Sequence, residues 1–137
     1  MRHLLTYKKL FESTETREYL QSCKTTIGDI LLDIKDDGFE VTDSFYTYSD
    51  RLTPGKSPIG VEIEIFAPKQ NRSFDFDSIE PTISHLISYL KSEGFELLPF
   101  RFYFHRGPNS EGMKRKTDIS EVKGRRKITK MEFKFRK

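Results

Sequence analysis

The chain has 137 residues, which is the size of a single domain with its own hydrophobic core. Only 35% of the residues are hydrophobic but 13% are aromatic, so a modest number of large rings must build that core. The single cysteine, Cys23, excludes an internal disulfide, and no apolar run approaches the roughly 18 residues that span a bilayer. We therefore expect a cytoplasmic location and no membrane partner.

A first helix is predicted from Thr14 to Asp37. Thr14 is a suitable N-cap, and acidic residues fill the first turn, where the helix dipole favours anions. Because Cys23 shares the apolar stripe of this helix, we interpret it as a core residue rather than a reactive thiol. Gly38 is predicted to end the helix in the left-handed conformation. The stripe repeats every 3.6 residues and comprises Tyr19, Leu20, Cys23, Ile27, Ile30, Leu31 and Ile34.

A second helix is predicted to begin at the segment Asp77-Ser78-Ile79-Glu80-Pro81. Asp77 followed three residues later by Glu80 is typical of a capping box, and Pro81 suits the first turn of a helix. Gly94 is expected to end this helix as Gly38 ends the first.

Four strands are predicted at about 39–48, 60–67, 95–106 and 128–136. The second and fourth alternate apolar and polar residues, which predicts one buried face and one open face. In the third, phenylalanines are expected to face the helices, whereas Arg101, Tyr103 and His105 share the open face. Pro99 indicates an edge or a bulge in that strand.

The two hairpin connections differ in length. Residues 49–59, which include Thr53-Pro54-Gly55, are expected to form a moderate loop. Residues 107–127 are expected to form a long basic loop, and a loop of that length in a compact domain is usually functional or disordered.

An approximate internal repeat at an offset of 56 residues sets the expected architecture. Residues 27–48 align without a gap on residues 83–104, with five identities in 22 positions, including both Gly-Phe-Glu triplets. The similarity arises either from a duplication or from the sequence requirements for ending a helix and starting a strand, which both halves share. The order αββαββ predicts an α+β domain: a four-stranded, mostly antiparallel sheet with both helices on one face, as in a ferredoxin-like fold in a permuted order.

Catalytic and metal-binding patterns are missing from the sequence. The histidines His3, His85 and His105 lack metal-ligand spacing, and no Gly-x-Ser-x-Gly motif is present. Glu62 and Glu64 are expected on one face of a strand, where we favour a solvated surface over an acid–base pair. We expect no enzyme activity, no cofactor and no bound metal.

One minor alternative is a metal-dependent nuclease. The triplet Glu132-Phe133-Lys134 resembles the Glu-x-Lys end of restriction-type nuclease sites, which also need an aspartate to hold Mg²⁺. Asp118 is the nearby upstream candidate, but it lies in the predicted loop among basic residues.

The charge of the chain is unevenly distributed. Residues 113–137 carry 11 Lys or Arg and 3 Asp or Glu, whereas residues 1–112 carry 13 and 18. This asymmetry indicates an anionic partner or an electrostatic match between copies of the chain, and the alternative is a solvated loop and strand face.

An aromatic ring among basic residues is typical of sheet surfaces that bind single-stranded nucleic acid. Glutamates at 62, 64 and 132 share the face and are expected to compete by pairing with its cations. The candidate nucleic-acid-binding residues are Arg101, Tyr103, His105, Lys114, Arg115, Lys116, Lys123, Arg125, Arg126, Lys127, Lys130, Lys134 and Arg136.

The segment MRHLLTYKKLFE opens the chain with apolar side chains among basic ones. It resembles the N-terminal tags of small proteins of large tailed bacteriophages, including internal head proteins. For residues 1–12, the resemblance implies packaging into the prohead and cleavage after a Leu-x-Glu triplet, here Leu10 to Glu12, which leaves Ser13 first. The alternative is an amphipathic N-terminal helix that packs on the domain. We interpret residues 1–13 as a tag or docking segment and residues 14–137 as the domain.

Two hypotheses of different classes follow. The first is a non-enzymatic phage accessory protein that contacts nucleic acid through the basic sheet face and its adjoining loop. The second is an interaction factor that binds a host or virion protein. The expected location is the host cytoplasm or the virion, and the sequence leaves open DNA against RNA and the oligomeric state.

Overall fold

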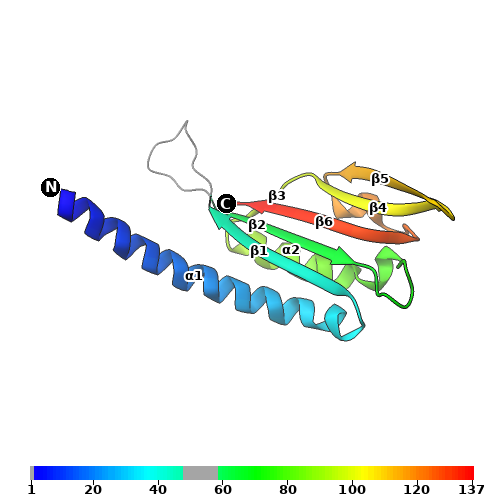
Figure 1. Ribbon diagram of the computed structural model, residues 1–137, viewed down its shortest axis with the longest axis horizontal. Helices are drawn as coiled ribbons and strands as arrows, with labels where there is room; N and C mark the ends of the chain where they lie inside the picture. Colours follow the sequence, from blue (N-terminus) through cyan, green and yellow to red (C-terminus); the bar gives the residue numbers. More distant parts are fainter. Residues whose placement is uncertain (1, 48–58) are drawn as a thin grey trace.

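The computed structural model describes residues 2–47 and 59–137, and for residues 2–16 and Thr47 it describes the backbone alone. The described residues confirm the expected α+β class, with two α-helices and an antiparallel sheet (Figure 1). The expected loop 49–59 lies outside the described residues apart from Ile59. The elements are α1 (Arg2–Asp36), β1 (Glu40–Thr47), β2 (Ile59–Phe66), the 3-10 helix η1 (Phe76–Ser78), α2 (Glu80–Ser92), β3 (Glu96–Leu97), β4 (Phe100–Gly107), β5 (Ser110–Lys116), the 3-10 helix η2 (Ile119–Val122) and β6 (Ile128–Arg136).

Both helices end in the same way, as the repeat predicts. Gly38 has φ +95° and Gly94 has φ +91°, the left-handed conformation that favours glycine. The amide of Phe39 donates to the carbonyl of Ile34, and the amide of Phe95 donates to that of Leu90. Each helix therefore ends in a Schellman motif, and the shared Gly-Phe-Glu triplet marks it.

The helix starts differ from those predicted. α1 begins at Arg2 rather than Thr14, because no glycine or proline precedes Gly28 and nothing interrupts the helix. Figure 1 shows the N-terminal turns of α1 extending beyond the end of the sheet. Ile79, not Asp77, is the N-cap of α2, and no side chain caps it there. Pro81 lies in the first turn, as expected.

The sheet is built around an antiparallel pair formed by β2 and β6. The strand order is β1-β2-β6-β4-β5, so each half of the repeat contributes an inner and an outer strand, and β5 is added at one edge. Glu64 lies directly opposite Glu132 in this central pair. The sheet has six strands rather than four because β5 is additional and the third predicted strand is divided in two.

The division of the third strand occurs at Pro99, where a bulge was expected. β3 and β4 both pair with β6, but the register changes by one residue between Leu97 opposite Phe135 and Arg101 opposite Glu132. Proline has no amide to donate to a ladder, so the pairing is interrupted there.

The expected long loop 107–127 is corrected by the structure, which places β5 and η2 within it. Gly107 pairs with Ser110, so Pro108 and Asn109 form a tight turn between β4 and β5. Gly-Pro-Asn-Ser is a turn sequence, which explains why a hairpin replaces the loop.

A single hydrophobic core lies between one sheet face and the helices. It combines the α1 and α2 stripes with the inward residues of β2, β4 and β6, and Cys23 is buried as predicted. Across the described residues, neither helix is long and apolar enough to cross a membrane. The largest fully buried side chains include Phe76, Phe100, Phe102, Phe133 and Phe135.

Candidate nucleic-acid interface

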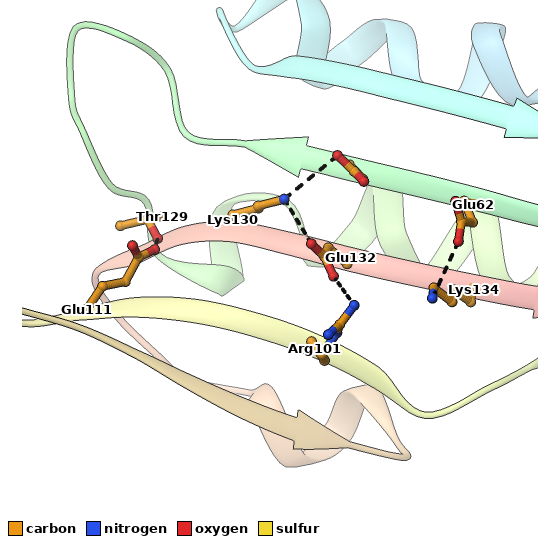
Figure 2. Close-up of polar contacts among 8 residues, drawn as sticks. Glu62, Arg101, Glu111, Thr129, Lys130, Glu132 and Lys134 are labelled. Carbon is orange, nitrogen blue, oxygen red and sulfur yellow. Dashed lines mark hydrogen bonds and ion pairs between the residues drawn. The ribbon is translucent and has the colours of Figure 1, made fainter.

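On the open face of the sheet, Glu132 lies between two cations (Figure 2). Its carboxylate oxygens are 2.8 Å from Lys130 Nζ and 2.8 Å from Arg101 Nη2, and only 13% of the side chain is exposed. Burial raises the pKa of the Glu132 carboxyl, but the hydrogen bond from Lys130 and the nearby positive charges outweigh it and leave the pKa below its usual value. The same hydrogen bond raises the pKa of Lys130.

The other two glutamates of this face are also close to lysines. Lys134 Nζ is 3.4 Å from Glu62, and Lys130 Nζ is 3.8 Å from Glu64. The cross-strand pairing expected from the sequence is therefore present. The positive charges of Lys130, Lys134 and Arg101 are largely offset on this face, which leaves little net charge to attract a phosphate backbone.

The aromatic candidate of this face, Tyr103, lies beside a lysine. Lys130 Nζ is 5.5 Å from the centre of the Tyr103 ring and 5.0 Å from that of Phe66. Tyr103 is half-buried, and it lies opposite Lys130 on one strand and Met113 on the other. The lysine contact engages part of the ring that a nucleic-acid base would need for stacking.

The basic residues of β5 divide between the two faces of the sheet. Arg115 lies opposite Arg101, so it belongs to the open face. Lys114 and Lys116 lie opposite Phe102 and Phe100, on the side of the helices. Lys116 is 3.7 Å from Glu121 of η2, whereas Lys114 is exposed.

Arg125 contributes to the packing of the core rather than to the open surface. Its guanidinium carbon is 4.1 Å from the centre of the Phe104 ring and 5.5 Å from that of Phe102. Its carbonyl accepts a 2.9 Å hydrogen bond from the amide of Phe76. These contacts fix the segment 123–127 against η1, and the Asp77 side chain accepts another hydrogen bond from the amide of Gly124.

The remaining candidates lie at two ends of the sheet. Lys123 and Arg126 are exposed beside Arg125. Arg136 is aligned with Gly60 and Glu96, at the opposite end of β6 from the β6 start at Ile128. The thirteen candidates therefore do not form one continuous surface on the open face.

A hollow of about 460 Å³, which we call the basic hollow, lies at the end of the sheet where β4 turns into β5 and β6 begins. Its lining contains two predicted candidates, His105 and Lys127, and two arginines that the sequence interpretation missed, Arg72 and Arg106. Arg72 carried no signal because only the fold brings the segment after β2 to this end. The other described residues of the lining are Ser73, Gly107 and Pro108.

The nuclease arrangement is not assembled in the structure. The Asp118 carboxylate accepts a 2.9 Å hydrogen bond from the amide of Ser120 and caps η2, and this bond lowers its pKa. Glu132 is engaged by Lys130 and Arg101. Within the described part of the chain, no group of three or more His, Cys, Asp or Glu side chains is arranged to hold a metal.

Comparison with protein-family models, with curated proteins and with solved structures gave no match to this chain.

Proposed function

We propose that this chain is a nucleic-acid-binding protein whose contact surface is the basic end of the sheet rather than its open face. The basic end comprises the basic hollow, β5 and the segment 123–127. The proposal rests on one observation: among the described residues, some cations are paired with glutamates and others have no acidic partner, and the two groups lie in different parts of the sheet. Arg101, Lys130 and Lys134 on the open face are offset by glutamates, whereas the exposed cations of the basic end, including Arg115 at the sheet edge, are not.

The ion pairs define this separation. Arg101, Lys130 and Lys134 each lie within 4.0 Å of a glutamate oxygen. Among the described residues, no carboxylate lies that close to the exposed cations of the basic end, and only Lys116 there has an acidic partner. Charges that are not offset attract phosphates and release counterions on binding. The exposed cations are Arg72, Arg106, Lys114, Arg115, Lys123, Arg126 and Lys127.

A charge-removal variant tests the proposal. Lys114, Lys123 and Arg126 are exposed, so replacing all three with alanine is expected to leave the fold intact. Binding of a fluorescent 20-nucleotide single strand and of the matching duplex is measured by anisotropy over a series of salt concentrations. Each lost phosphate contact is expected to reduce the slope of log affinity against log salt by about 0.7 for the single strand. Arg125 is left unchanged because it packs on Phe104.

The matched control removes the same charge from the helices. Lys24, Lys35 and Lys91 are exposed on α1 and α2, and their alanine variant should bind nearly as wild type. Equal losses in the two triple variants would show that net charge, and not this surface, governs binding. Failure of the wild-type protein to bind either nucleic acid at low salt would exclude the proposed function.

The second candidate function, binding of a host or virion protein, is supported by the shape of α1. This helix has 35 residues, and its N-terminal turns extend beyond the sheet (Figure 1). We propose residues 1–12 as the docking or packaging segment of a phage protein, on the resemblance of their sequence. A pull-down from a bacterial host lysate with full-length and Ser13-start chains tests this, because one defined protein retained only by the full-length chain would favour it.

We also propose that β1, β2, β6 and β4 correspond to a ferredoxin-like sheet in permuted order. The order β1-β2-β6-β4 supports this relation, because moving the first strand of a βαββαβ chain to its end produces the same neighbours. In this view, β5 is an addition that carries part of the basic end.

A further inference from the structure

The basic hollow is formed by three separate segments that meet at one end of the sheet. Arg72 and Ser73 follow β2, His105 and Arg106 end β4, and Lys127 precedes β6. Among the described residues, no acidic residue is part of its lining. Three permanent cations and a histidine therefore surround one concavity, which is an arrangement suited to an anion.

The backbone of the hollow is fixed by the core beneath it. Phe74 and Ile128 exchange two hydrogen bonds of 2.8 Å, and both side chains are buried. The amide of His105 donates to the carbonyl of Lys127 at 3.0 Å. These bonds hold the backbone of the neighbouring lining residues in place, so the backbone of the hollow is fixed before any ligand binds.

Two residues of the lining have an unusual backbone conformation. Arg72 has φ +58° and Lys127 has φ +61°, and they are the non-glycine residues with positive φ in the described part of the chain. Glycine would adopt this conformation at lower cost. Backbone strain concentrates at ligand-binding sites, so long basic side chains at these two positions favour a role in binding.

We propose that the basic hollow binds a terminal phosphate monoester of the nucleic acid that the basic end contacts. The inference rests on the proposed function and specifies how a strand end is recognised. A terminal monoester carries a charge of about −1.5 to −2 at pH 7, whereas an internal phosphodiester carries one negative charge. Arg72, Arg106 and Lys127, with His105, match the larger charge, and a concave site suits a chain end better than a continuing backbone.

The test compares single strands of one sequence with a 5′-phosphate, a 3′-phosphate or hydroxyls at both ends. Wild-type protein is expected to bind one of the phosphorylated strands about tenfold more tightly than the hydroxyl strand, the effect of one additional charge-assisted contact. The double variant Arg72→Gly with Lys127→Gly removes two cations of the hollow. It also relieves the positive-φ strain, so the fold is expected to be retained. This variant should bind all three strands with affinities that agree within about twofold.

The matched control is Lys114→Ala with Arg126→Ala, which removes the same charge outside the hollow. This variant should bind all strands more weakly but retain the terminal-phosphate preference. Equal binding of the three strands by wild type overturns the inference and leaves the proposed function standing. Retention of the preference in the glycine variant overturns the assignment to this hollow. Absence of binding to any strand overturns the proposed function, and the inference with it.

Discussion

Glu64 and Glu132 lie directly opposite each other on the two central strands, and Lys130 links them. Its Nζ is 2.8 Å from one glutamate and 3.8 Å from the other. Like charges in directly opposite positions destabilise a sheet, so Lys130 offsets a repulsion that the pairing of the two halves creates.

Loss of this lysine is therefore expected to cost stability. Lys130→Met keeps much of the apolar stem but leaves the two glutamates facing each other, and the loss should be about 1–3 kcal/mol. Adding Glu132→Gln should recover part of the loss. Urea unfolding of the single and double variants measures both effects. Lys134→Met is the control, because its pair with Glu62 is more exposed and is worth about 0–1 kcal/mol.

The lowered pKa of Glu132 predicts a dependence of stability on pH. The stabilising contribution of this carboxylate is fully present above the ordinary glutamate pKa of about 4.3 and is lost as the pH falls through the lower folded value. Glu132→Gln should therefore lose less stability than wild type as the pH falls from about 5 into the acid range. Free energies of unfolding at several pH values provide the measurement, and parallel curves would contradict the prediction.

Replacing glycine with alanine should lower stability at the helix ends and raise it in the helix interior. Gly38→Ala and Gly94→Ala place a side chain at positive φ, which costs about 1–2 kcal/mol. A Cβ at either position would meet only ordinary contacts, so the cost arises from the backbone. Gly28→Ala should instead stabilise α1 by about 1 kcal/mol. Thermal unfolding of the three variants measures their relative stability, and a Gly94→Ala variant more stable than wild type would contradict the prediction.

Removal of residues 1–12 should leave the domain folded. Arg17 and Glu18 are exposed, and Tyr19 is the first described side chain of α1 that bonds outside the helix, with its hydroxyl 3.0 Å from a carboxylate oxygen of Glu93, just after α2. A chain that starts at Ser13 retains this contact and the complete apolar stripe. Its melting temperature should change little, and a chain that fails to fold would make the segment a structural part of the domain.

Local sequence patterns predicted most of the fold, because helices, strands and helix ends are determined by residues that are close together in the sequence. Alternation of Ile63 and Ile65 with glutamates marked β2, and glycines 38 and 94 marked the helix ends. Within the β4–β5 hairpin, β4 was predicted from its alternating phenylalanines, but β5 was missed because its residues lack apolar alternation. β5 pairs as an edge strand of mostly exposed residues, with no hydrophobic stripe to reveal it.

The candidate site was predicted less well for a physical reason. The sequence supplies the number of cations but not the identity of their partners. Glu132 engages Arg101, and Lys130 reaches Glu64, only because β6 lies between β2 and β4. In the same way, Arg72 reaches the hollow only because its segment pairs with β6 through Phe74.

The position of β5 at the sheet edge has a consequence for local motion. Among the described strands, β5 is hydrogen-bonded to β4 alone, whereas β6 lies between two neighbours. Local opening that frees β5 breaks a single ladder, so its amides are expected to exchange with solvent sooner than those of β6. A nucleic acid seated on Lys114 and Arg115 would cover the edge that opens most readily. Its footprint would then appear as slowed amide exchange in β5 rather than in the core.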